Sequence, residues 1–198
     1  MMDNRSIQGF TLIELLVVIS IIGLFSSVAL ASFSEARLSA QYTKARLDIK
    51  TLANLVDMAK GNGNRTLHQI TGSYCSECAC RSPGFALPIT VSLHTLPNTH
   101  PCFTSYYSLV SLLNNNTGGL YAMRTPPLDP WGVPYLINEN EGEVLGGGCV
   151  VDCGPCAYDN ITSAGPNGLY YDTDDVTYNI PSLRCPNPIT HHVNTNWY

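Results

Sequence analysis

The sequence is poor in charge, and basic residues are especially scarce. Charged residues make up 13% of the 198 positions and the formal net charge is −5, whereas a typical soluble protein has about twice that charged share. Residues 61–198 hold ten acidic and only four basic side chains. Because nucleic-acid binding requires a basic face, this acidic portion argues against a nucleic-acid partner.

The sequence also lacks the short motifs that mark common enzymes. It contains no Gly-x-Ser-x-Gly nucleophile elbow, no phosphate-binding loop and no dinucleotide fingerprint. His100 lies near Cys102, but closeness in sequence does not make a catalytic dyad, and His191 and His192 lie in a Pro- and Asn-rich tail. We therefore expect no enzymatic activity.

The charge deficit comes from one apolar segment, residues 10–33. These 24 residues are long enough to cross a bilayer as a helix. Glu14 is the one charged side chain among them, and a carboxylate at the centre of such a helix costs about 2.5–3.5 kcal/mol. Intramembrane acids usually find a partner and mark function. We expect a transmembrane helix over 10–33; a plain anchor, or a secretory signal peptide cleaved near Ala29-Leu30-Ala31, is the alternative.

The helical pattern continues over residues 34–60, without proline or a turn cluster before Gly61. Apolar residues recur in alternating steps of four and three, which predicts an amphipathic helix with one buried stripe. Lys44 and Asp48 are spaced for an i,i+4 ion pair, and Gly61 is a natural residue to end the helix. The stripe consists of Leu38, Tyr42, Ala45, Ile49, Leu52, Val56 and Ala59.

The remaining residues, 61–198, predict a globular domain of short elements. A helix is expected around 106–113, ending in the Asn- and Gly-rich stretch 114–119. A long helix followed by clustered strands indicates an α+β fold with a small antiparallel sheet. The strand candidates are 87–93, 133–137, 144–151, 169–171 and 176–180.

Eight cysteines lie in this domain, all beyond the apolar segment. An even number of cysteines behind a membrane segment is typical of disulfides in an oxidising compartment. The two Cys-x-x-Cys pairs also fit zinc ligand spacing, so zinc is the alternative. The disulfide candidates are Cys75, Cys78, Cys80, Cys102, Cys149, Cys153, Cys156 and Cys185.

A short acidic segment near the end of the domain is a candidate metal site. Asn167, Asp172, Asp174 and Asp175 place oxygen ligands within nine residues, between two strand candidates. Calcium takes six to eight such oxygens from flexible loops. We expect a calcium site here; the alternative is a solvated acidic turn.

The N-terminal residues closely resemble a known processing signal. The run Gly9-Phe10-Thr11-Leu12-Ile13-Glu14-Leu15-Leu16-Val17-Val18-Ile19 is similar to the prepilin cleavage and methylation signal of type IV pilins and type II secretion pseudopilins. The resemblance implies that residues 1–9 are a leader, that a prepilin peptidase cuts after Gly9, and that Phe10 becomes N-methylated. It further implies that Glu14 pairs with the Phe10 ammonium of a neighbouring subunit.

Two motifs within 128–180 resemble the major pseudopilin family of type II secretion. One is Leu128-Asp129-Pro130-Trp131-Gly132-Val133-Pro134-Tyr135; the other is Ser163–Gly168 followed by Asp174-Asp175-Val176. The second resembles that family's calcium-binding loop, which implies Asp174 and Asp175 as ligands. Asn167 stands where the family usually has Asp, and Tyr171 where it usually has Gly. The Cys-rich stretch 66–119 has no counterpart in the resemblance.

The sequence thus predicts a structural subunit of a helical filament, and the resemblance implies a type II secretion pseudopilus. The subunit would wait in the cytoplasmic membrane as a single-pass protein with its globular domain outside the cytoplasm. Its partners would be copies of itself, other pilins or pseudopilins, the peptidase and the inner-membrane assembly platform. A type IV pilin is one alternative, and a membrane-anchored disulfide-rich binding domain without filaments is another.

Overall fold

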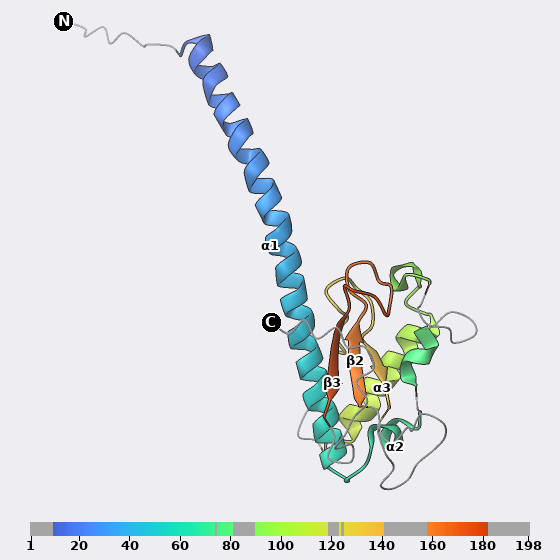
Figure 1. Cartoon of the computed structure of the whole chain (residues 1–198). Helices are drawn as coiled ribbons and strands as arrows, with labels where there is room; N and C mark the ends of the chain where they lie inside the picture. Colours follow the sequence, from blue (N-terminus) through green and yellow to red (C-terminus); the bar gives the residue numbers. More distant parts are fainter. Residues whose placement is uncertain are drawn as a thin grey trace, which may run out of the picture. The chain divides into compact units, whose positions relative to one another are not determined.

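The computed structural model describes residues 10–73, 75–80, 90–118, 123, 125–140 and 158–181. The chain divides into two compact units, Met1–Ala40 and Gln41–Tyr198. Helix α1, Leu12–Gly61, begins in the first unit and ends in the second (Figure 1). The predicted leader, 1–9, lies outside the described residues.

The first unit consists of the beginning of α1. Its apolar side chains from Phe10 to Phe25 are exposed around the whole helix. Two serines, Ser20 and Ser27, satisfy their hydroxyls by donating to the backbone carbonyls of Leu16 and Leu24, both at 2.8 Å. Among the residues that the structure describes, no helix combines the length and the apolar character needed to cross a membrane.

The end of α1 supplies the buried stripe that the sequence predicts. Of its seven members, Ala45, Ile49, Leu52, Val56 and Ala59 are buried, whereas Leu38 is 42% exposed, so burial begins later than predicted. The predicted ion pair between Lys44 and Asp48 is present. The helix ends at Gly61, as predicted, although Gly61 is still helical and the left-handed residue comes later, at Asn64 with φ 46°.

Four further helical segments of the described residues come from the Cys-rich stretch: the helices α2 and α3 and the 3₁₀ turns η1 and η2 (Leu93–Thr95). Helix α2, Leu67–Thr71, begins with a capping box between Thr66 and Gln69, a signal that the sequence analysis missed. The 3₁₀ turn η1 covers Ser76–Cys80. Helix α3, Pro101–Asn115, confirms the predicted helix and extends it at its beginning, where Pro101 occupies the first turn and His100 accepts from the Cys102 amide.

The sheet is antiparallel, with strand order β1-β2-β3. Strand β1, Leu136–Asn138, overlaps the end of the predicted 133–137, and β3, Val176–Ile180, matches its prediction. Strand β2, Asp159–Ser163, was missed because its sequence is mostly polar. It lies between its neighbours, with Ile161 opposite Ile137 and Tyr178.

Two strand predictions were wrong, and a third cannot be compared. Residues 169–171 belong to a loop, where Tyr171 has φ 80° and cannot pair in a ladder. Residues 90–93 are not a strand either, because Leu93–Thr95 forms the 3₁₀ turn η2. The candidate 144–151 and residues 87–89 lie outside the described residues.

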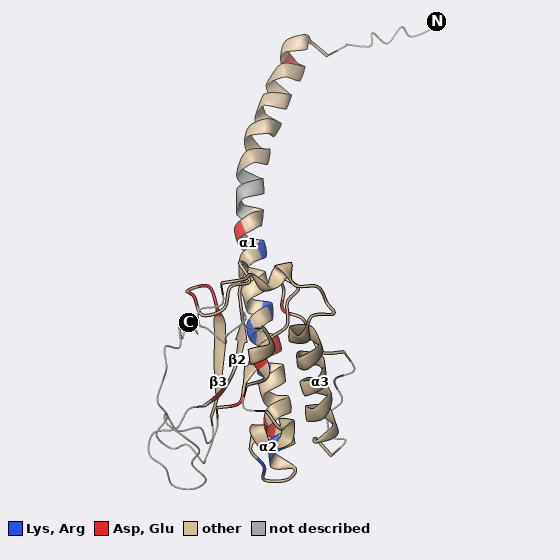
Figure 2. Ribbon diagram, turned by 90° about the vertical axis from the view of Figure 1, so that its right-hand side faces the viewer, with Lys and Arg blue, Asp and Glu red and all other residues tan. Residues whose placement is uncertain are grey.

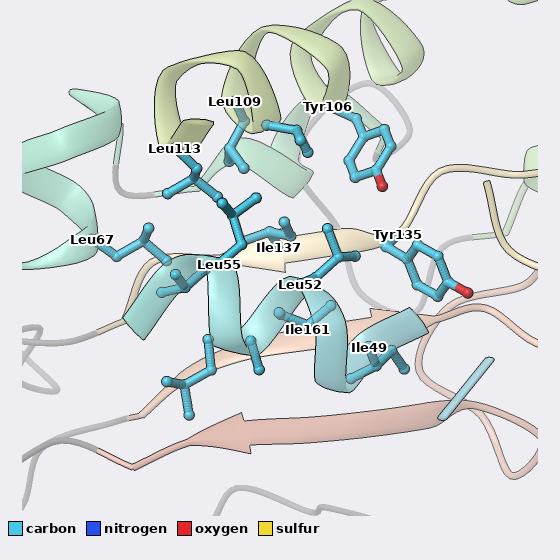
Figure 3. Close-up of a cluster of buried hydrophobic side chains, with 14 of the residues drawn as sticks. Ile49, Leu52, Leu55, Leu67, Tyr106, Leu109, Leu113, Tyr135, Ile137 and Ile161 are labelled. Carbon is cyan, nitrogen blue, oxygen red and sulfur yellow. The ribbon is translucent and has the colours of Figure 1, made fainter. Parts of the chain in front are cut away.

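The core of the second unit joins α1, α3 and the sheet. Figure 3 shows Leu52 and Leu55 of α1 beside Leu109 and Leu113 of α3, with Ile137 of β1 at the same junction. Full burial of each such side chain contributes about 1.5–3 kcal/mol. The long helix packed on an antiparallel sheet confirms the predicted α+β fold.

A buried ion pair connects the end of α1 to the sheet. Lys60 Nζ lies 3.1 Å from Asp159 Oδ2, and the Asp159 side chain is fully buried. The pair brings together residues 99 positions apart. Because a buried carboxylate without its cation is strongly unfavourable, this pair holds the helix end in register with β2.

Candidate functional site

The first candidate site is the beginning of α1. The amide and hydroxyl of Thr11 both donate to Glu14 Oε2, each at 2.8 Å, and the Glu14 amide donates to Thr11 Oγ at 3.3 Å. This reciprocal arrangement is a capping box, in which each side chain satisfies a backbone amide that the first helical turn leaves without a partner. Glu14 is therefore held locally by a residue three positions away.

The surroundings of Glu14 are apolar and uncovered. Phe10 is 88% exposed, and Ile13 and Leu15 are exposed as well. Figure 2 shows one acidic residue near the start of α1, and the sequence contains no further Lys, Arg, Asp or Glu until Glu35. Such a helix, apolar on all faces, requires lipid or other apolar helices around it. Gly9, on the other side of the predicted cleavage point, lies outside the described residues.

The second candidate site is the loop between β2 and β3, residues 164–175, which we name the acidic loop. Its first part turns sharply at Gly165 and Gly168, which have φ 61° and 68°. A Cβ at Gly165 would lie 2.6 Å from the Asp174 carbonyl oxygen, so only glycine allows the two arms of the acidic loop to approach. This close approach brings the predicted ligands into one place.

Three of the four predicted ligands converge in the acidic loop. One carboxylate oxygen from each of Asp172, Asp174 and Asp175 lies within 4.8 Å of the others. Asp174 Oδ1 and Asp175 Oδ1 are buried without a hydrogen-bond partner. Since calcium binds carboxylate oxygens at about 2.3–2.6 Å, this spacing and these two bare oxygens fit a calcium ion.

The pKa values of the aspartates in the acidic loop also fit a bound cation. Burial, together with the charges of Asp172 and Asp174, raises the pKa of Asp175 to about 7. Burial and the neighbouring Asp172 raise the pKa of Asp174 to about 6. Partial burial acts against the ionised form of Asp172 too, but hydrogen bonds from Asp174 and Asn167 outweigh it and lower its pKa. The cluster therefore holds negative charge that a cation or a proton must compensate.

Asn167, the fourth predicted ligand, lies beside the aspartates and makes hydrogen bonds within the acidic loop. Its Nδ2 donates to Asp172 Oδ2 at 2.7 Å, and its Oδ1 accepts from the Leu169 amide at 2.6 Å. The side chain thus orients Asp172 and closes the turn. Asp172 and Asp175 in turn accept backbone amides of the acidic loop, from Asp174 at 3.2 Å and from Tyr171 at 2.7 Å.

A segment far away in sequence also holds the acidic loop, and no sequence signal pointed to it. Ser92 Oγ donates to the Asn167 carbonyl at 2.7 Å, and the Leu93 amide donates to the Gly168 carbonyl at 2.9 Å. His94 Nε2 lies 3.2 Å from the Pro166 carbonyl oxygen. We name this segment, Ser92–His94, the 92–94 turn.

The Asp129–Pro134 motif is a structural element of the same region. Asp129 is buried and accepts the amides of Trp131 and Val133 at 3.0 Å each, and the Ser163 hydroxyl at 2.7 Å. The motif therefore forms a turn closed by the Asp129 carboxylate. Trp131 is partly buried and packs edge-on against Tyr42, with ring centroids 5.1 Å apart.

The four described cysteines form disulfides, Cys75–Cys78 and Cys80–Cys102. Their sulfurs are therefore not available as thiolate ligands for zinc. Among the described residues, the acidic loop is the one group of metal-binding side chains that converges. The other four candidates, Cys149, Cys153, Cys156 and Cys185, lie outside the described residues.

The chain is similar in sequence to known proteins. Residues 4–30 match the family model described as a prokaryotic N-terminal methylation motif. The type II secretion system core protein G of Escherichia coli (strain K12) is 32% identical over 170 residues, which cover 86% of this chain and 89% of that protein. The core protein G of Pectobacterium carotovorum is 26% identical over 85% of this chain and 82% of its own length.

A fimbrial protein matches over a shorter region. The probable minor fimbrial protein of Dichelobacter nodosus is 31% identical over 40% of this chain and 48% of its own length. No solved structure matches the chain. Since the Escherichia coli protein is 32% identical over 86% of this chain and the methylation motif matches its beginning, the chain belongs to the type II secretion system core protein G family, the major pseudopilins.

Proposed function

We propose that this chain is a structural subunit of a type II secretion pseudopilus, not an enzyme. The observation that carries the proposal is the similarity to core protein G over 86% of the chain, together with the methylation motif at its beginning. Subunits assemble with other pseudopilins into a filament. The match to the fimbrial protein covers less than half of either chain, so it does not favour a surface pilus.

Processing of the N-terminus would prepare the subunit for assembly. We infer that a prepilin peptidase removes residues 1–9 after Gly9 and that the new amino group of Phe10 is methylated. Methylation leaves this amine cationic. The result is a helix that begins with an ammonium group, followed four residues later by the Glu14 carboxylate.

Glu14 would set the position of one subunit against the next. In the single subunit its carboxylate accepts two hydrogen bonds from Thr11, but these donors carry no charge, so the ion remains uncompensated in an apolar environment. The Phe10 ammonium of a neighbouring subunit supplies the missing positive charge. Pairing relieves the cost of both buried ions and fixes the axial offset between adjacent helices.

Before assembly, residues 10–33 would lie in the cytoplasmic membrane as a single pass. This membrane state is a proposal that goes beyond the hydropathy of the described helix. Its support is the exposure of the apolar side chains from Phe10 to Phe25 on every face of α1, and the inner-membrane assembly platform is the expected partner there. The second unit would lie outside the cytoplasm, where an oxidising environment maintains its disulfides.

We further propose that the acidic loop binds calcium. Asp172, Asp174 and Asp175 would supply carboxylate oxygens, with backbone carbonyls and water completing six to eight ligands. Bound calcium would neutralise the repulsion among the three carboxylates. It would thereby stabilise the connection between β2 and β3, close to the buried turn at Asp129.

Complementation in the host tests the secretion function. Deletion of the gene should abolish export of type II substrates, and the wild-type gene should restore it. The control is a sister strain that lacks the secretion motor. Normal export in the deletion strain, with loss of surface filaments instead, would contradict the pseudopilus and identify a pilin.

A further inference from the structure

The 92–94 turn contacts the acidic loop through three successive carbonyl groups. The carbonyl oxygens of Pro166, Asn167 and Gly168 face His94, Ser92 and the Leu93 amide respectively, at 3.2, 2.7 and 2.9 Å. One short segment therefore contacts residues 166–168, which we call the first arm of the acidic loop. Contacts of this kind orient backbone groups that would otherwise rely on solvent or on a cation.

The 92–94 turn is itself firmly anchored. Leu93 is fully buried in a small apolar cluster that also contains Ala164 and Tyr170, one near each end of the acidic loop's first arm. The same cluster contains Cys80 and Cys102, both buried. Their disulfide closes a loop with a sequence separation of 22, and the 92–94 turn lies within this loop.

The acidic loop and the 92–94 turn lie so close together that the turn restricts the position of the loop. A Cβ at Gly168 would lie 2.6 Å from His94 Cδ2 and 2.7 Å from Ser92 Oγ. Gly168 also has φ 68°, so a side chain there would be strained even without these contacts. The acidic loop and the 92–94 turn therefore fit each other only with glycine at this position.

We propose that Ser92 and His94 are positioning residues for the acidic loop, holding its first arm in the folded shape when no cation is bound. Calcium would then bind a loop that is already ordered and would not have to offset the whole entropy of ordering it. The inference rests on the proposed function only in taking the acidic loop as the calcium site.

The donor set of the acidic loop follows from the same contacts. Since the carbonyls of residues 166–168 each already contact the 92–94 turn, we expect the carboxylates of Asp172, Asp174 and Asp175 to be the principal ligands of the cation. Asn167 is engaged with Asp172 and Leu169. An aspartate ligand at position 167 would have ordered the acidic loop from within. In this chain the 92–94 turn orders it from outside.

Hydrogen exchange of the full mature protein in detergent tests this inference. The probes are the amides of residues 168–174, measured in EDTA and in excess calcium chloride. The test variant combines Ser92→Ala with His94→Ala. Ser108→Ala is the matched control, because it removes a hydroxyl from an exposed position of α3 outside the 92–94 turn.

In EDTA, the double variant should exchange these amides at least about tenfold faster than the wild type, because two hydrogen bonds that close the acidic loop are gone. Excess calcium should restore most of the protection, and the control should match the wild type. His94→Gln in the presence of Ser92, which keeps an N–H donor, should recover protection relative to His94→Ala. If the double variant does not fold, the two single variants carry the test, each with a severalfold increase.

Equal exchange of the double variant and the wild type in EDTA would overturn the inference, as would a rise that spreads equally over the amides of α3. Failure of the calcium proposal has a different signature. In that case calcium would change exchange in none of the proteins, while the double variant would still exchange faster than the wild type, which supports the positioning role.

Discussion

The beginning of α1 and the acidic loop both hold carboxylates that need a partner, but the exposed Glu14 and the partly buried aspartates are satisfied differently. Glu14 is held by a residue three positions away, and its helix leaves apolar side chains exposed on every face. The aspartates of the acidic loop are crowded together and accept backbone amides of that loop, whose carbonyls at 166–168 contact a segment about 75 residues away in sequence. We propose that the first region is completed by neighbouring subunits and that the second is completed by a cation.

The largest effect is expected when removal of the leader is blocked, because cleavage after Gly9 would free the Phe10 amino group for pairing with Glu14. Gly9→Leu should block cleavage, leave residues 1–9 attached and abolish filament formation, because no Phe10 ammonium is released. Mass spectrometry of the first peptide measures this directly. The second unit should remain folded with its disulfides intact; a processed N-terminus at Phe10 in this variant would contradict the role of Gly9.

The next largest effect concerns the stability of the second unit alone. Lys60→Met should lower the free energy of unfolding by about 3–5 kcal/mol, because it leaves the buried Asp159 carboxylate without its cation. Denaturant unfolding followed by circular dichroism measures the loss. Lys50→Met, at an exposed position of the same helix, is the control. An equal loss of unfolding free energy in both variants would show that the Lys60–Asp159 pair is not important for stability.

The pH dependence of stability should include a contribution from the acidic loop. The pKa values of Asp174 and Asp175 are about 6 and about 7, above the ordinary aspartate value of 3.8. At a pH between 3.8 and about 7, the folded protein therefore binds more protons than the unfolded chain. Without calcium, stability from these groups should therefore fall as the pH rises from 5 to 8. The increase in Tm on adding calcium should be larger at pH 8 than at pH 5.

A matched variant makes that measurement specific. Asp175→Asn removes the group with the higher pKa and should flatten the pH dependence of Tm in EDTA. It should also weaken calcium binding by about tenfold or more in titration calorimetry, since one carboxylate ligand is lost. A calcium-induced shift in Tm that is unchanged by Asp175→Asn would exclude this carboxylate as a ligand.

The smallest effect concerns backbone strain in the acidic loop. Tyr171 has φ 80°, a conformation that glycine adopts freely and tyrosine does not. Tyr171→Gly should therefore stabilise the acidic loop by relieving about 1 kcal/mol of strain, partly offset by the greater freedom of glycine in the unfolded chain. Thermal unfolding in EDTA measures the difference; a clear loss of stability would show that contacts of the tyrosine ring dominate.

How far the sequence could predict the molecule depended on how local each signal was. The helix that became α1, the stripe from Ala45 to Ala59 and the convergence of the three aspartates followed from periodicity and spacing within short windows. Strand β2 was missed because Asp159 and Asn160 hide its pattern; only its pairing with β1 and β3 makes it a strand.

Contacts between distant residues carried no sequence signal at all. The pairing of Lys60 with Asp159 and the contact of the 92–94 turn with the acidic loop depend on the folded chain bringing the segments together. The two described disulfides show the same limit, because eight cysteines allow 105 pairings on spacing alone. The hydrogen bond by which Asn167 orients Asp172 carried no sequence signal either, and the prediction of Asn167 as a ligand stays a prediction.

The most direct test of the account is filament assembly in Glu14→Gln. Glutamine preserves the capping box with Thr11, since it can accept the same backbone amide, but it removes the negative charge. We predict normal leader cleavage, normal amounts of protein, no pseudopili by electron microscopy of cells that overproduce the subunit, and no export. Pseudopili as abundant as in the wild type would show that Glu14 only caps its own helix, and would contradict charge pairing between subunits.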